Sequence, residues 1–255
     1  MTVSIDQNSP SSIGLVGLFA GRHDLRRLIV ALSIFCAFVV WTIAIHGPLG
    51  SIEGSDDAFY LEVAHLWTQG VLPYVGAFDI KPPGFFAILA AAETLLGPSL
   101  QTLKAVSIVF DAVTATALFF IGCRMGSRGL GLFAALLYPF LSQFVTNNVA
   151  YTPLAAFTTL AFLAALSPLP IMNRAILTGL AIGAACAVKQ TAAFEAVALL
   201  IILWRAPDAS ARRLSVGLAF GLTAAIAPLG FLLYFAAHGA AGALIDDVVM
   251  IALRS

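Results

Sequence analysis

A series of long apolar stretches, separated by short polar turns, runs through most of this chain. The stretches cover residues 28–45, 84–97, 105–123, 129–145, 149–166, 175–188, 191–204 and 214–237. Hydrophobic residues make up 60% of the chain and charged residues only 10%, whereas soluble domains contain roughly 25% charged residues. Apolar runs of this kind are typical of membrane helices. We therefore expect an all-α polytopic membrane protein.

The arginines predict how such a protein would be oriented. Arg22, Arg26 and Arg27 precede the first apolar stretch, which lacks a small-x-small cleavage site and is therefore interpreted as a retained signal anchor. The positive-inside rule then places residues 1–27 in the cytoplasm as a tail and residues 47–104 outside as a loop. The expected location is the inner (plasma) membrane, with the amino terminus in the cytoplasm.

The stretch at 84–97 is too short for an ordinary crossing. Its 14 residues would span about 21 Å, less than a hydrocarbon core of roughly 30 Å. We expect it to lie in the interface or re-enter the membrane, because a full crossing would put Arg124 and Arg128 outside. Seven crossings then remain within a module at 28–238, plus interfacial helices in the outer loop, and residues 239–255 form a short outer tail.

A turn is predicted at Lys189–Gln190. One helix across 175–204 would be about 45 Å long, and it would place Arg205, Arg212 and Arg213 outside. Two shorter helices keep these arginines cytoplasmic. In this topology every arginine except Arg254 is cytoplasmic.

The outer loop contains a predicted helix with acidic residues at its start. Ser55 is a favourable N-cap, and Asp56 and Asp57 occupy the first turn, where the helix dipole favours negative charge. An apolar stripe follows at Phe59, Val63, Leu66 and Trp67, and Gly70 is expected to end the helix. Such a helix would lie on the membrane and hold both carboxylates at the water–lipid boundary. The alternative is that they only cap a surface helix.

The lysines are distributed differently from the arginines. All three, Lys81, Lys104 and Lys189, lie on the predicted outer side, where the topology rule disfavours cations, so an anionic headgroup is their expected partner. Lys81 is followed by Pro82 and Pro83, which stiffen the chain and would display the lysine from a rigid turn. The alternative is an interfacial lysine that snorkels towards water.

Taken together, these motifs resemble a known enzyme family. An amino-terminal anchor, Asp-Asp-x-x-Tyr followed by LEVAHLWTQG, then FDIKPPGFF and later GLAIGAACAVKQTA, resemble the GT-C glycosyltransferases of the aminoarabinose transferase and protein O-mannosyltransferase type. The resemblance covers roughly residues 28–235. It implies transfer of a sugar, with inversion, from a polyprenyl-phosphate carrier to a lipid, glycan or protein acceptor on the outer side of the membrane.

The resemblance also implies roles for individual residues. Asp56 matches the family's catalytic acid, with Asp57 and Tyr60 as supporting members of the site. Lys81 matches the lysine that contacts the carrier phosphate, and Lys189 is a second phosphate candidate.

The chain departs from the family in two respects. Thr152 stands where relatives often carry a second acid, which weakens the case for a divalent metal, and we expect no cofactor. Relatives also usually continue beyond this module, so a truncated form or a non-catalytic membrane subunit that needs a partner subunit is an alternative.

Two acids within the apolar stretches, Asp111 and Glu195, allow a further interpretation. Each should either line a cavity or form a structural hydrogen bond, because an isolated acid in lipid is costly. A transporter, with Asp111, Lys189 and Glu195 along its path, is the rival interpretation, although no internal repeat supports it. The histidines show no metal-ligand spacing. Topology explains the arginines, so no nucleic-acid partner is expected.

Overall fold

The computed structural model describes residues 29–30, 32–37, 39–40, 55–77, 79–145 and 151–251, and every secondary-structure element in these ranges is helical. The named helices are α2 (Ser55–Thr68), α3 (Pro83–Leu96), α4 (Leu100–Arg124), α5 (Arg128–Val145), α6 (Tyr151–Ala165), α7 (Ile171–Val188), α8 (Ala192–Arg205), the 3₁₀ turn η2 (Pro207–Ala209), α9 (Arg213–Ala237), α10 (Ala241–Ile245) and the π-helical turn η3 (Asp246–Met250). The expected all-helical fold is confirmed for these residues.

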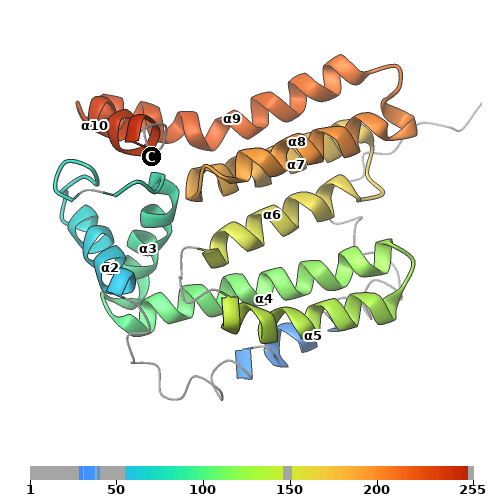
Figure 1. Cartoon of the computed structure of the whole chain (residues 1–255), viewed down its shortest axis with the longest axis horizontal. Coiled ribbons are helices and arrows are strands. Elements are labelled where there is room, and N and C mark those ends of the chain that lie inside the picture. Colours follow the sequence, from blue (N-terminus) through green and yellow to red (C-terminus); the bar gives the residue numbers. More distant parts are fainter. Residues whose placement is uncertain are drawn as a thin grey trace, which may run out of the picture.

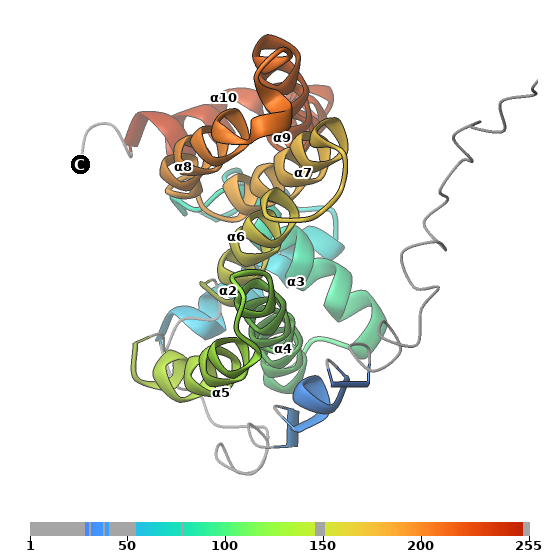
Figure 2. The same cartoon turned by 90° about the vertical axis from the view of Figure 1, so that its right-hand side faces the viewer.

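Helices α4 to α9 lie side by side, and α2, α3 and α10 gather at one end of them (Figure 1). α4 packs against α5 and α6, α6 against α7, and α7 against both α8 and α9. Figure 2 shows these helices stacked, with α5 and α9 at opposite edges. Because successive helices alternate in direction, the start of α6 and the turn between α7 and α8 both lie at the end that carries α2 and α3, called here the α2–α3 end.

The arginines that the structure describes lie at the opposite end of the stack. Arg124 and Arg128 flank the turn from α4 to α5, Arg174 lies in the first turn of α7, and Arg205 and Arg213 flank the connection from α8 to α9. Some of them tie these turns together: Arg124 Nη1 donates to the Leu166 carbonyl at 3.3 Å and Arg174 Nε to the Ala165 carbonyl at 2.9 Å. Among the described residues, these arginines are therefore separated from Lys81, Lys104 and Lys189, which lie at the α2–α3 end.

Three helices in the described part of the chain, α4, α7 and α9, are long and apolar enough to cross a membrane. This finding supports a membrane protein, but it supports fewer spans than the seven expected. α6 has 15 residues and α8 has 14, because a Ser-Pro-Leu-Pro segment follows α6 and the turn at Lys189–Gln190 precedes α8. The first expected crossing, 28–45, lies partly outside the described residues.

The helix α2 packs against α3 through a face that shares Val63 with the predicted apolar stripe. Tyr60 and Val63 are 1% exposed, and they pack against Phe85 and Phe86 of α3, whereas Phe59 is 38% exposed. α3 thus covers the face of α2 that carries Tyr60, and the contact of the apolar stripe with the membrane stays a prediction. Gly70 follows the helix with φ of +90°, as its predicted role as the stop requires.

The segment after α9, expected to be a short outer tail, is helical as far as the structure describes it. Ala240 and Leu244 are buried in a cluster with Phe235 of α9 and Tyr74 from the loop after α2. These residues hold the end of α9 against that loop. The cluster formed by Phe235, Ala240 and Leu244 is called the α9–α10 corner below.

Candidate functional site

The backbone of Lys81 is fixed on both sides by hydrogen bonds. Its N–H donates to Asp79 Oδ1 at 2.7 Å, and its carbonyl accepts from the Tyr74 hydroxyl at 2.6 Å. Pro82 then caps α3 and Pro83 begins it, a position that proline favours because its missing N–H would have no partner within the helix. The sequence Lys-Pro-Pro therefore fixes the lysine at the entry of a helix, as predicted.

The side chain of Lys81 is more enclosed than a displayed lysine would be. Nζ lies 3.7 Å from Asp79 Oδ1 and 4.3 Å from the centre of the Tyr60 ring, and the side chain is only 18% exposed. Asp79 was missed in the sequence, although an acid two residues before a proline-locked lysine is a typical turn-forming signal. Lys81 thus stands in a rigid turn, as predicted, and Asp79 and Tyr60 partly enclose its ammonium group.

Tyr60 connects Lys81 to the first acid of α2. Its hydroxyl donates to Asp56 Oδ2 at 3.1 Å, one helical turn away, and its ring meets the Phe85 ring edge to face at 5.2 Å. Asp56 is exposed and Tyr60 is buried. A carboxylate open to solvent therefore contacts the hydroxyl of one buried tyrosine, and a half-enclosed ammonium lies over the ring of the same tyrosine.

Asp57 has a different environment from Asp56. Consecutive residues of a helix point about 100° apart, and Asp57 is only 5% exposed. The structure therefore does not place the two acids as an equivalent pair facing one site.

The turn between α7 and α8 lies against the Lys81 turn. Gln190 Nε2 donates to the Ile80 carbonyl at 3.4 Å, and Gly84 faces the Ala187 backbone so closely that a Cβ there would overlap its carbonyl oxygen. Lys189 caps the end of α7, and its Nζ lies 3.7 Å from the centre of the Tyr151 ring of α6. Lys81 and Lys189 thus belong to adjoining turns, and each ammonium lies over a tyrosine ring, an arrangement that stabilises cations.

The two acids within the helix stack have different surroundings. Asp111 Oδ1 of α4 accepts from the Tyr138 hydroxyl of α5 at 2.7 Å, which corresponds to the structural alternative considered for this acid. Glu195 of α8 is half-buried, and the hydroxyl of Thr158 on α6 donates to the Leu154 carbonyl of its own helix at 2.9 Å.

Thr152 lies in the first turn of α6. It is 5% exposed, and Ser107 Oγ of α4 donates to its hydroxyl oxygen at 3.3 Å. The residue therefore takes part in the contact between α4 and α6.

A second polar cluster, which the sequence did not reveal, joins α2 to α3. Glu93 is 4% exposed and its Oε2 lies 3.3 Å from His65 Nδ1, while His65 Nε2 lies 2.8 Å from Gln69 Nε2. An amide nitrogen can only donate, so His65 Nε2 accepts and the proton of a neutral ring is on Nδ1, towards Glu93. Burial raises the pKa of Glu93, and His65 partly offsets that rise.

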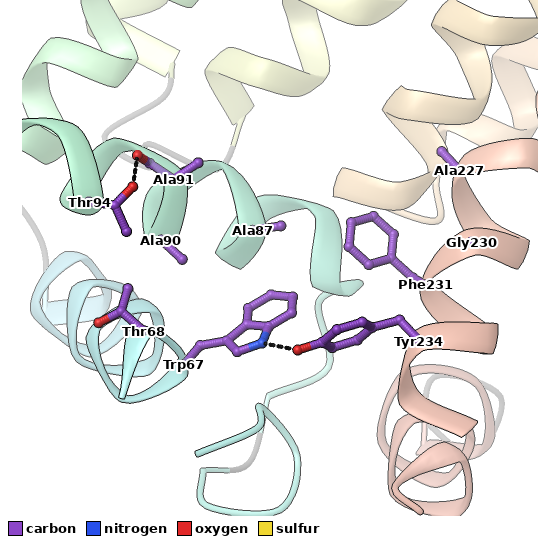
Figure 3. Close-up of a pocket in the computed structure, with 10 residues that line it drawn as sticks. All are labelled: Trp67, Thr68, Ala87, Ala90, Ala91, Thr94, Ala227, Gly230, Phe231 and Tyr234. Carbon is purple, nitrogen blue, oxygen red and sulfur yellow. Dashed lines mark hydrogen bonds between the residues drawn. The ribbon is translucent and has the colours of Figure 1, made fainter. Parts of the chain in front are cut away.

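An apolar pocket of about 520 Å³ lies between α2, α3 and α9 (Figure 3). Its lining residues are mainly small or aromatic: Trp67, Thr68, Ala87, Ala90, Ala91, Thr94, Ala227, Gly230, Phe231 and Tyr234. Trp67 Nε1 donates to the Tyr234 hydroxyl at 3.2 Å and so joins α2 to α9 beside the pocket. Trp67 lies two turns after Tyr60 and Ala87 one turn after Pro83, so the two helices that line the pocket also carry residues of the site.

The described ranges contain no group of three or more His, Cys, Asp or Glu side chains that could hold a metal ion. Compared with known proteins, the chain matches no protein-family model, no curated protein and no solved structure.

Proposed function

We propose that this chain is a membrane glycosyltransferase of the GT-C type, which transfers a sugar from a polyprenyl-phosphate carrier to a lipid, glycan or protein acceptor. The observation that carries the proposal is the contact chain from Asp56 through Tyr60 to Lys81, with Asp79 behind the lysine. It brings a solvent-facing carboxylate and a cation from separate segments to one place. That place lies at the α2–α3 end, and α2 and α3 also line an apolar pocket.

In this proposal Asp56 and Lys81 act on opposite sides of the transferred sugar. Asp56 accepts the proton of the acceptor hydroxyl as its oxygen attacks the anomeric carbon. The bond from that carbon to the phosphate oxygen breaks, and its electron pair stays on the polyprenyl phosphate. Lys81 stabilises the negative charge that develops there. A single displacement of this kind inverts the anomeric configuration.

The pocket suits the hydrocarbon part of such a carrier. Its walls are formed largely by alanine, glycine and aromatic side chains, which favour apolar chains. Lys189, in the turn beside Lys81, supplies a second cation for the phosphate group. Asp57 supports the site from inside the fold as a buried neighbour of Asp56.

The same proposal places the protein in the inner (plasma) membrane with seven crossings and a cytoplasmic amino terminus. The gathering of arginines at one end of the stack supports this orientation. The shorter helices α6 and α8 would then require local thinning of the bilayer or snorkelling of flanking residues. α3, with 14 residues, would lie at the outer interface.

The test is incorporation of label from a panel of radiolabelled polyprenyl-phosphate sugars into membrane extracts containing the expressed chain. Asp56→Asn and Lys81→Ala should each abolish incorporation. Glu62→Gln is the matched control, because Glu62 is an exposed acid of the same helix and should leave transfer intact. Full transfer by either site variant would refute the proposed roles. If the folded wild-type chain transfers no sugar from any donor, a non-catalytic membrane subunit is favoured.

A further inference from the structure

The loop between α2 and α3 contains a residue in an unusual backbone conformation. Tyr74 has φ of +68° and is 8% exposed, and within the described ranges it is the non-glycine residue with positive φ. Bulky residues rarely adopt this region of conformational space. Such a conformation persists only where surrounding contacts impose it.

Those contacts come from both ends of the side chain and from the backbone. The Tyr74 N–H donates to the Ala77 carbonyl at 2.9 Å, which closes the loop. Its ring lies 5.5 Å from the Phe235 ring and is buried in the α9–α10 corner. Its hydroxyl, at the far end of the rigid ring, donates to the Lys81 carbonyl at 2.6 Å.

We propose that Tyr74 is a positioning residue for Lys81, through which the α9–α10 corner sets the place of the phosphate-binding lysine. This inference rests on the role of Lys81 in the proposed function. An aromatic side chain has few rotatable bonds. The ring of Tyr74 packs against Phe235 and its hydroxyl bonds the Lys81 carbonyl, so a shift of the corner would also shift the backbone of Lys81. Asp79 completes the support by bonding the N–H of the same residue. Lys81 is thus held directly by Asp79 and Tyr74, and Tyr74 is held in turn by the α9–α10 corner.

The test is a double-mutant cycle on binding of sugar-free polyprenyl phosphate to the full chain in lipid nanodiscs. Tyr74→Phe removes only the hydroxyl and keeps the ring packed. One lost hydrogen bond corresponds to a dissociation constant about threefold to tenfold higher. Lys81→Ala should weaken binding more strongly. In the Lys81→Ala background, Tyr74→Phe should have no further effect, because a positioning residue acts only through the group that it positions.

Tyr138→Phe is the control, because it also removes a hydroxyl that donates a short hydrogen bond, but Tyr138 lies on α5. It should lower stability without changing the affinity for polyprenyl phosphate. If Tyr74→Phe binds polyprenyl phosphate as tightly as the wild type and Lys81→Ala binds it more weakly, the positioning role of Tyr74 is refuted. The phosphate-binding role of Lys81 then stands. If Tyr74→Phe weakens binding equally in both backgrounds, Tyr74 acts independently of Lys81, and the inference is again refuted. If Lys81→Ala binds like the wild type, the proposed function itself loses its phosphate site.

Discussion

The contact between α3 and α7 at Gly84 provides a test of how tightly the candidate site is packed. A Cβ at position 84 would lie 2.7 Å from the Ala187 carbonyl carbon and 3.0 Å from its Cβ, and it would overlap the carbonyl oxygen. Carbon atoms prefer a separation of about 3.5–4.0 Å. The carbonyl group of Ala187 is part of the α7 backbone, and its Cβ is attached directly to that backbone. No side-chain rotation can therefore relieve the overlap.

Gly84→Ala should therefore force α3 and α7 apart by about 1 Å. Overpacking of this kind typically costs about 1–3 kcal/mol. For a chain of roughly this size, each kcal/mol lowers the melting temperature by about 2–4 °C, so we expect a decrease of about 2–12 °C. Because Gly84 follows Lys81 directly after the two prolines, the same shift should lengthen the hydrogen bond from Gln190 to Ile80.

The measurement is thermal unfolding of the detergent-solubilised chain, with Gly221→Ala as the matched control. Gly221 also lies within a helix, α9, but a Cβ there would meet no atom within 4 Å. Removing a glycine from a helix interior should stabilise the chain by about 0.5–1 kcal/mol. The packing argument fails if Gly84→Ala melts at or above the wild-type temperature, or if both variants lose the same stability.

Two further predictions concern buried polar groups. Tyr138→Phe removes a 2.7 Å hydrogen bond to Asp111 between α4 and α5. It should cost about 1–3 kcal/mol, measured as a lower midpoint of denaturant unfolding. An unchanged midpoint would show that this bond contributes little. Burial raises the pKa of Glu93 above the ordinary value of 4.5, so the folded state binds this proton more readily than the unfolded state does. The free energy of unfolding should consequently fall as pH rises from 4.5 through the raised pKa. In melting curves recorded across pH, Glu93→Gln should show a smaller fall in stability over this range than the wild type. An equal fall in both proteins would contradict a raised pKa of Glu93.

Features of the site that depend on neighbouring residues were accessible from the sequence. Asp56 and Tyr60 are four residues apart on one helix, and such residues meet on its surface. The Lys-Pro-Pro segment predicts the entry to α3, because proline fixes the backbone there. The turn at Lys189–Gln190 also follows from a local limit, since a single helix would exceed the membrane thickness.

Other features of the site required the tertiary structure. The pairing of His65 with Glu93 joins helices separated by a long loop, and no spacing rule links the two residues. The contact of Tyr74 with Phe235 joins residues more than half the chain apart. The face of α2 that packs on protein likewise depends on which side of the helix α3 covers.

The sequence by itself determined that this chain forms apolar helices, where several of them begin and end, and which ends carry arginine or lysine. These properties follow from the transfer free energy of each side chain and from local backbone preferences. Tertiary structure alone decided which side chains meet at Lys81, because those contacts depend on packing between segments that are distant in the chain. Apolar helices can pack in many ways with similar burial, and close fits such as Gly84 against Ala187 select one arrangement.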